Sequence, residues 1–386
     1  MKLELKLAYR NLIGAGLRTW LNVAVLSFTF IIIIFYNAFL DGWQKQSRLD
    51  GIQWEFGNGQ LQNDKYDAFD MFSITDGHGI LPIDERKNLE PILVRNGTIY
   101  PKGRLVPITI KGIDVNQNTV KIPTNLLEKT TNGISAVIGK RMAASTKLRI
   151  GDEILLRWRD KNGTYDAANV SIVGIFNTTI ANVDNNQLWV SLDKLREVTG
   201  LENETSYFIA KDGYQPHKVD GWTFVSQESL LKSINSAVAT ERIGSMVIYL
   251  VLLAVALLAI FDTQVLSIFR RQKEIGTFVA LGMTRKEVVN IFTIEGSMYA
   301  IFASIVGGIF GTPLFIYTAI KGISLWSDLG DGMGVSIADT IHPIYSFNLI
   351  AGTFAVIVIL ATLVSLLPAR KISRMNPVSA LKGKIL

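Results

Sequence analysis

Polar side chains recur at a fixed interval in an otherwise apolar run near the start of the chain. Asn22, Thr29 and Tyr36 follow one another every seven residues, which places them on one face of a helix. Because such a stripe is unfavourable against lipid, it predicts either hydrogen bonds to neighbouring helices or the lining of a cavity. The adjoining apolar face would offer acyl chains a surface, and its members are Leu26, Phe30, Ile33, Phe35 and Phe39.

A carboxylate lies inside a second apolar run. Asp262 is followed by Thr263 and Gln264 within the segment from Met246 to Phe269. Exposing the charge to hydrocarbon would cost several kcal/mol, so Asp262 must face protein or water. Two interpretations stay open for it: packing between helices, and a role as a relay of motion along the helix.

The side-chain patterns of catalytic sites are missing from the sequence. The stretch Gly133 to Arg141 (GISAVIGKR) comes nearest to a phosphate-binding loop, but it has one residue too many between its glycines and lacks the hydroxyl that binds Mg²⁺. The three histidines show no metal-site spacing, and the chain has no cysteine. We therefore expect no catalytic residue, no metal and no cofactor in this chain. An energy-using function would need a separate subunit that binds ATP and Mg²⁺.

Four apolar segments explain how these residues are positioned. Each reaches the roughly 20 residues that a helix needs to cross a bilayer. They are residues 21–40, 246–269, 291–320 and 347–367. The first lacks a small-residue cleavage signature, which favours a retained span over a signal peptide.

Basic residues predict the orientation of these segments. The N-terminal arm, the link between the second and third segments, and the C-terminal tail are rich in Lys and Arg, whereas acids and bases nearly balance between Asp41 and Ile243. By the positive-inside rule, both termini are cytoplasmic and the long polar stretch is extracytoplasmic. The net charge of +6 is then a signal of membrane orientation and gives no reason to expect nucleic acid binding.

The long polar stretch mixes the periodicities of strands and helices. Alternation of β-branched or aromatic residues with polar ones predicts strands at 104–114, 152–158, 169–176 and 187–191. Helical spacing predicts helices at 84–95, 139–148, 192–199 and 227–240, with Ser226 or Gln227 starting the last. The expected fold is an α+β domain of segregated small sheets in two subdomains.

The predicted organisation is a membrane protein with four transmembrane α-helices and this α+β domain between the first and the second. In chain order we expect a cytoplasmic amphipathic helix (1–20), a first transmembrane helix (21–43), an extracytoplasmic α+β domain (44–243), a second transmembrane helix (244–269), a cytoplasmic coupling segment (270–290), a third transmembrane helix (291–320), an extracytoplasmic loop (321–346), a fourth transmembrane helix (347–368) and a cytoplasmic tail (369–386).

Three motifs carry a resemblance to a family. The segment Phe269 to Gly296 (FRRQKEIGTFVALGMTRKEVVNIFTIEG), the tail Leu367 to Leu381 (LPARKISRMNPVSAL) and the opening Leu7 to Leu21 (LAYRNLIGAGLRTWL) resemble those of FtsX-like permeases, the membrane subunits of type VII ABC transporters in the MacB/LolCDE superfamily. Thr284 is a candidate N-cap for a helix start after the break at Gly282. The resemblance implies that this region couples to an ATPase, and the implied coupling residues are Glu274, Gly282, Met283, Thr284, Arg285, Lys286 and Glu287.

The resemblance also implies a function. The polar domain is most similar to lipoprotein-releasing permeases of the LolC and LolE type, although Arg157 to Val170 is a compact hairpin where LolC has a hook. The expected protein is therefore a bacterial inner-membrane permease that works by mechanotransmission with an ATPase dimer and a second permease, as homodimer or heterodimer. It would extract a lipid-anchored protein from the outer leaflet, and docking of a periplasmic chaperone stays open. The alternatives are MacB-like export of a periplasmic peptide or drug, and FtsX-like regulation of a cell-wall hydrolase.

Overall fold

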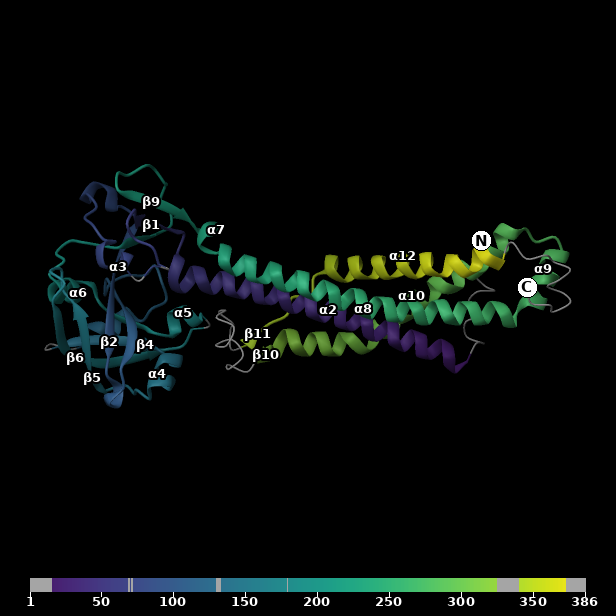
Figure 1. Cartoon of the computed structure of the whole chain (residues 1–386), viewed down its shortest axis with the longest axis horizontal. Helices are drawn as coiled ribbons and strands as arrows, with labels where there is room; N and C mark the ends of the chain where they lie inside the picture. Colours follow the sequence, from purple (N-terminus) through teal and green to yellow (C-terminus); the bar gives the residue numbers. More distant parts are fainter. Residues whose placement is uncertain are drawn as a thin grey trace. The chain divides into compact units, whose positions relative to one another are not determined.

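The computed structural model of the chain describes residues 16–68, 70, 72–129, 133–178, 180–324 and 340–372. These residues form two compact units (Figure 1). The helical unit takes its residues from Met1–Gly42, Ala239–Ile323 and His342–Leu386, and the β unit from Trp43–Val238 and Ser324–Ile341. Most of the predicted amphipathic helix, the extracytoplasmic loop and the cytoplasmic tail lie outside the described residues.

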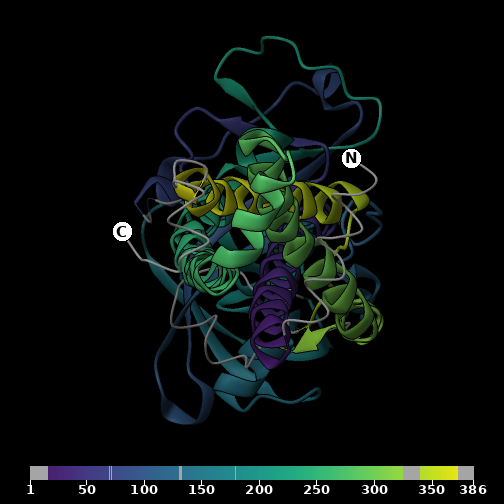
Figure 2. The ribbon, with the colours of Figure 1, turned by 90° about the vertical axis from the view of Figure 1, so that its right-hand side faces the viewer.

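Long helices make up the helical unit, and Figure 2 shows them nearly end-on. Their bounds are α2 (Leu17–Gly51), α8 (Lys232–Arg270), α10 (Arg285–Lys321) and α12 (Phe347–Ile372), with the shorter α9 (Gln272–Ala280) after α8. The four long helices are long and apolar enough to cross a membrane, which confirms the four predicted spans. All four extend beyond the apolar segments seen in the sequence.

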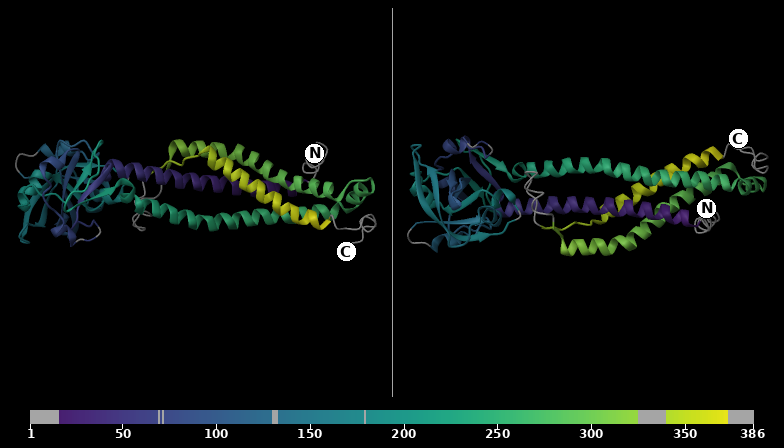
Figure 3. Two further views of the ribbon diagram at one scale, coloured as in Figure 1. Left: turned by 90° about the horizontal axis from the view of Figure 1, so that it is seen from above. Right: turned by 60° about the horizontal axis from the view of Figure 1, so that its bottom comes forward.

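The four long helices share one apolar core. Val23, Leu26, Phe30 and Ile34 of α2 pack there against residues of α8, α10 and α12 such as Ile260. The α10 and α12 helices run side by side in both views of Figure 3. Hydrogen bonds also join the helices: the Ser27 hydroxyl donates to the Ala303 carbonyl at 2.8 Å, and the hydroxyls of Ser297 and Thr362 lie 2.8 Å apart.

Small residues let α10 approach α2. Gly307 and Gly311 are buried on the same face as Ala303, and a Cβ added at Gly307 would lie 2.9 Å from Cδ1 of Phe30. The neighbouring row of Ser304, Gly308 and Thr312 is partly exposed, and a Cβ at Gly308 would meet nothing within 4 Å. Only the first row is therefore a close packing surface within the described part of the chain.

The β unit is built on one branched sheet. Six strands form a closed ring in the order β2-β3-β7-β4-β6-β5, because β2 pairs with both β3 and β5, and β8-β1-β9 continue outward from β2. The strands are β1 (Gly59–Asn63), β2 (Leu89–Ile99), β3 (Val106–Ile113), β4 (Ile134–Gly139), β5 (Glu153–Arg159), β6 (Tyr165–Phe176), β7 (Gln187–Ser191), β8 (Tyr207–Ala210) and β9 (Trp222–Ser226). The expectation of segregated small sheets is therefore wrong, since one ladder of hydrogen bonds connects all nine strands.

Short helices and turns connect the strands. They are the π-helix Ile52–Phe56, the α-helices α3 (Ser73–Asp76), α4 (Lys140–Thr146), α5 (Ala181–Asp184), α6 (Leu192–Thr199) and α7 (Gln227–Leu230), and the 3₁₀ turns Ile83–Arg86, Pro101–Gly103 and Thr124–Lys129. A separate two-stranded pair consists of β10 (Ile323–Ser324) and β11 (Thr340–Ile341). The predicted helices at 139–148 and 192–199 are confirmed as α4 and α6, and the Ser226 hydroxyl caps α7 as expected.

The helix predicted at residues 84–95 is instead a short turn followed by β2. The predicted helix included Glu90 and Arg95, but both side chains are buried in the strand. The Lys211 ammonium binds Glu90 at 2.8 Å, and Arg95 donates to the carbonyls of Ile74 and Thr75. Burial raises the pKa of Glu90 and lowers the pKa of Arg95. Charged side chains that are buried with partners can therefore give a strand the spacing of polar residues that is expected of a solvent-exposed helix.

Candidate functional site

The turn between α9 and α10 closes one helix and opens the next with two capping motifs. Gly282 adopts φ 99°, its N–H donates to the Val279 carbonyl at 3.1 Å, and the Met283 N–H donates to the Phe278 carbonyl at 3.0 Å. This is a Schellman motif, in which glycine tolerates the left-handed backbone. Thr284 then caps α10 as predicted, so Gly282, Met283 and Thr284 fix the corner.

The cap of α10 is a reciprocal capping box. The Thr284 hydroxyl accepts from the Glu287 N–H at 3.3 Å, and the Glu287 carboxylate accepts from the Thr284 N–H at 2.7 Å. Together these bonds satisfy two of the amide groups that a helix start leaves without partners. Glu287 is therefore part of the corner's structure, whereas the sequence suggested only an exposed charge.

Arg271 joins the three helices at this corner. It occupies the N-cap position of α9, and its guanidinium donates to Glu274 at 3.0 Å and to Glu295 of α10 at 3.1 Å. The same group lies 5.2 Å from the centre of the Phe292 ring. Glu295 is 1% exposed, so its charge depends on partners such as the half-buried Arg271. We call Arg271, Glu274 and Glu295 the Arg271 clamp.

The charges left over at the corner are positive. Arg270, Lys273, Arg285 and Lys286 are exposed, and none of them forms an ion pair with another described residue. Glu274 and Glu287 are already occupied by Arg271 and by the capping box. Arg285 and Lys286 also occupy the first turn of α10, where the helix dipole disfavours cations. The corner therefore presents exposed cations without acidic partners among the described residues, on a doubly capped turn.

Beyond the clamp, α10 and α12 interlock at a glycine. A Cβ at Gly296 would lie 1.8 Å from Oγ of Ser365 and 3.5 Å from Nε2 of Gln264. Ser365 and Gln264 are fully buried, and the Gln264 amide has no partner among the described residues. The three helices α8, α10 and α12 thus meet too closely here for any residue larger than glycine.

The polar stripe of α2 mostly forms contacts within the helical unit. The Asn22 amide donates to the Thr263 hydroxyl of α8 at 2.6 Å, and the Thr29 hydroxyl donates to its own helix at the Val25 carbonyl. Tyr36 donates to Glu241 of α8. Asn22 and Thr29 are buried. The arrangement agrees with hydrogen bonding between helices, and these two residues line no open cavity in the described chain.

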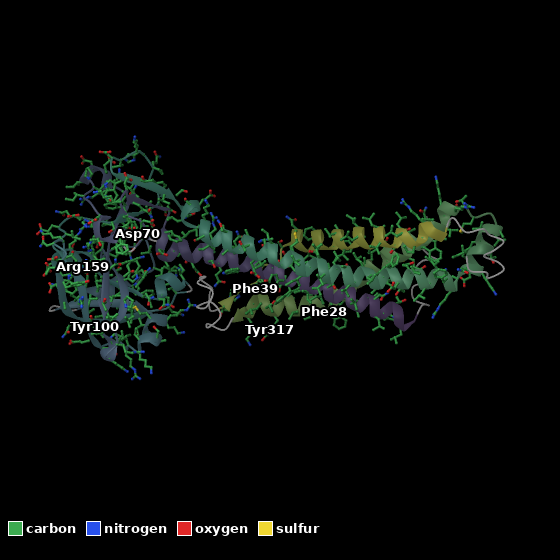
Figure 4. The ribbon with its side chains drawn as sticks, viewed as in Figure 1. Phe28, Phe39, Asp70, Tyr100, Arg159 and Tyr317 are labelled. Atoms are coloured by element: carbon green, nitrogen blue, oxygen red, sulfur yellow. The ribbon has the colours of Figure 1, made fainter. Side chains whose placement is uncertain are left out.

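The apolar residues assigned to the same cavity divide into two groups. Leu26 is 0% and Phe30 is 4% exposed, because both pack in the core of the helical unit. The expectation that they form an accessible surface for acyl chains is therefore wrong for this chain. Ile33, Phe35 and Phe39 stay half-exposed on α2, where Figure 4 labels Phe39.

Asp262 points away from the helices of its own chain. It is exposed, whereas its neighbours Thr263 and Gln264 are buried against α2, α10 and α12. Much of the rest of α8 is apolar and equally exposed, including Val251, Val255 and Leu258. The packing interpretation does not hold within this chain, and the relay role stays a prediction.

The sequence suggested only part of this site. Arg271 stood within the resembling motif and Glu295 stood out as a lone acid in an apolar segment, but nothing in their spacing showed that they touch across 24 positions. The one signal in the sequence was chemical: a carboxylate buried in an apolar segment needs a cation beside it.

Among the described residues, no group of three or more His, Asp or Glu side chains could hold a metal ion.

Residues 246–377 match the family of the FtsX-like permease C-terminal domain. An ABC transporter permease of Methanocaldococcus jannaschii is 23% identical over 254 residues, which cover 62% of this chain and 59% of that protein. The macrolide export ATP-binding/permease protein MacB of Escherichia coli is 26% identical over 168 residues, covering 44% of this chain and 24% of MacB. The pyoverdine export ATP-binding/permease protein PvdT of Pseudomonas fluorescens is 28% identical over 127 residues, covering 33% and 17%.

The chain therefore spans less than two thirds of the length of these relatives. The extracellular domain of the ABC-type transporter YknZ from Gram-positive bacteria aligns with 15% identity, 40% coverage of this chain and 83% of that domain, but its TM-score of 0.24 is too low to establish a common fold. The family match includes the helices that build the corner and the Arg271 clamp. Residues 246–377 are therefore similar to the C-terminal domain of FtsX-like permeases, and the chain is similar to ABC transporter permeases, MacB among them.

Proposed function

We propose that this chain is the permease subunit of an ABC transporter and that the corner between α9 and α10 docks a partner ATPase. The observation that carries the proposal is the set of exposed cations that the corner holds on a doubly capped turn. A rigid basic surface selects an acidic protein surface through charge complementarity. The relatives named as ATP-binding/permease proteins support the pairing of such a permease with ATPase activity.

The Arg271 clamp suggests how docking would act on the membrane helices. A force on Glu274 reaches Arg271 through one hydrogen bond and Glu295 of α10 through a second. The same arginine directly follows Arg270, where α8 ends. In this proposal, ATP-driven movement of the partner displaces α8 and α10 together, which is the mechanotransmission that the resemblance implies.

A charge-reversal experiment tests the docking surface. The variant R285E/K286E should lose co-purification of the ATPase, because both exposed cations become anions. The matched control K87E/K218E makes the same change in net charge at exposed lysines of the β unit and should leave co-purification intact. Retention of the ATPase by R285E/K286E would place the docking surface elsewhere.

We further propose that a second permease covers α8 at Asp262. An exposed carboxylate on a membrane-spanning helix is costly in lipid, and the exposed apolar residues beside it would pack well against another helix. Native mass spectrometry of the purified complex reports whether two permeases are present and whether they are identical. A single permease in an active complex would contradict this part of the proposal.

Two kinds of cargo remain candidates. The similarity to MacB and PvdT, together with the burial of Leu26 and Phe30, favours export of a molecule taken up on the side of the β unit. Release of a lipid-anchored protein would rely on the half-exposed Ile33, Phe35 and Phe39. A photo-crosslinker at Phe39 distinguishes the two, because only release predicts adducts with an acylated protein. The same probe at the exposed Phe310 of α10 is the control.

A further inference from the structure

The β unit has a hollow whose charged lining is almost entirely basic. Its volume is about 700 Å³, within the range of sites for small molecules. Lys102 comes from the turn after β2, Lys140 from α4, and Lys147, Arg149 and Asp152 from the connection between α4 and β5. Lys102 and the segment 140–152 thus line one concavity together, with four cations and one acid.

The four cations have no acid of their own to bind. None of Lys102, Lys140, Lys147 and Arg149 forms an ion pair with any residue that the structure describes. Asp152 is used to build the loop, since one carboxylate oxygen accepts the Arg149 backbone N–H at 2.8 Å. The hollow therefore keeps a net positive charge that a bound anion would neutralise.

The backbone around the hollow is held in place by hydrogen bonds. The Leu148 N–H donates to the Ala143 carbonyl at 3.0 Å, and the Gly151 N–H donates to the Ile172 carbonyl at 2.8 Å. Leu148 itself is 6% exposed and anchors the connection in the core of the sheet. The backbone that carries Lys147 and Arg149 is therefore anchored next to the hollow.

Two of these lysines adopt an unfavourable backbone conformation. Lys102 has φ 51° and Lys147 has φ 58°, a region that costs most side chains about 1 kcal/mol or more. The other non-glycine residues with positive φ in the described chain are all asparagines, which tolerate it best: Asn88, Asn186 and Asn203. Both exceptions line the same hollow.

We propose that the hollow is a binding site for a ligand that carries a phosphate group. Lysine ammonium groups bind phosphate oxygens as point charges, and the Arg149 guanidinium can bind two oxygens at once. Such a group belongs either to a free phosphorylated molecule or to the headgroup of a phospholipid. Ile150 follows Arg149 directly and Leu105 lies two residues after the turn that holds Lys102; both are 64% exposed and offer an acyl chain apolar surface. The site is independent of the proposed transport function.

Calorimetric titration of the full chain in zwitterionic detergent tests the proposal with two probes. Inorganic pyrophosphate represents the free ligand, and short-chain phosphatidylglycerol represents the headgroup. The variant K102N/K147N removes two charges while placing asparagine, which accepts positive φ, at both positions, so that the fold is preserved. It should weaken the binding of whichever probe binds by at least about tenfold. The exposed lysines of the control variant K65N/K218N lie outside the hollow.

Each outcome of the titration decides the question. Binding of pyrophosphate that K102N/K147N weakens and K65N/K218N does not would assign a free phosphorylated ligand. If phosphatidylglycerol binds more tightly than pyrophosphate, and I150S weakens the binding of the lipid further, the ligand is a phospholipid headgroup. The proposal is overturned if neither probe binds, or if both double variants weaken binding equally, because the effect would then be general attraction to a basic protein.

Discussion

The corner of the helical unit and the hollow of the β unit both present cations without acidic partners, but their shapes differ. At the corner, two acids are close to the cations but already have other hydrogen-bond partners: Glu274 binds Arg271, and Glu287 completes a capping box. In the hollow, four cations converge around a single acid that holds its own loop. Cations on an exposed turn suit a protein partner, whereas cations around a concavity suit a small anion. Charge alone therefore does not identify the partner.

Removing the Arg271 clamp should have the largest effect and should be confined to the helical unit. Arg271→Ala leaves the buried Glu295 carboxylate without this cation, and breaking a buried ion pair costs roughly 3–5 kcal/mol. A large drop in the melting temperature of the purified protein is expected, together with unchanged probe binding in the hollow. Arg271→Lys, which keeps the charge, should recover part of the loss. A melting temperature equal to that of the wild type would show that other groups neutralise Glu295.

Filling the glycine contact between α10 and α12 should have the next largest effect. Gly296→Ala forces a methyl group against Ser365, and overpacking of this kind costs about 1–3 kcal/mol. Gly308→Ala, on the open face of the same helix, is the control and should not destabilise the protein. Adding Ser365→Gly to Gly296→Ala should restore part of the stability. Equal losses in thermal denaturation for Gly296→Ala and Gly308→Ala would contradict the interlock.

Loss of the α10 cap should loosen the corner without affecting the clamp. Thr284→Ala removes the hydroxyl that accepts from the Glu287 N–H, at a typical cost of about 1 kcal/mol. Hydrogen exchange at the first amides of α10 should become faster, and ATPase co-purification should weaken. Thr284→Ser keeps the hydroxyl and should behave like the wild type. Unchanged exchange in Thr284→Ala would mean that Glu287 alone holds the turn.

The smallest expected effect is a pH dependence in the β unit. The Gln215 carbonyl and then Glu85 raise the pKa of the exposed His217 above its usual 6.5. Protonated His217 therefore stabilises the fold. This contribution is complete below about pH 6.5 and is lost as the pH rises through the raised pKa of His217. In an NMR titration, the pKa of His217 should lie above that of a free imidazole. In the Glu85→Gln variant, the pKa of His217 should lie closer to that of a free imidazole. Identical titration of both proteins would exclude the Glu85 contribution.

The sequence predicted these regions well where each residue depends on its neighbours in the chain, and poorly where it depends on partners that are distant in sequence. The four spans followed from apolar length alone, and the α10 cap followed from Thr284 and the break at Gly282, because these are local properties. The strand β2 was missed because Glu90 and Arg95 are buried with partners far away in sequence. The hollow left no signal either, since Lys102 is distant in sequence from the other cations and only the folded backbone shows the positive φ of Lys102 and Lys147.

Site-specific crosslinking in cells tests the central claim most directly. A photo-reactive residue at Lys286, on the exposed first turn of α10, should form an adduct with an ATP-binding protein, identified by mass spectrometry. The same residue at Lys218 of the β unit should not. Adducts of the Lys286 probe with lipid alone, or an ATPase adduct formed equally at Lys218, would contradict the claim that this corner is the docking surface for the ATPase.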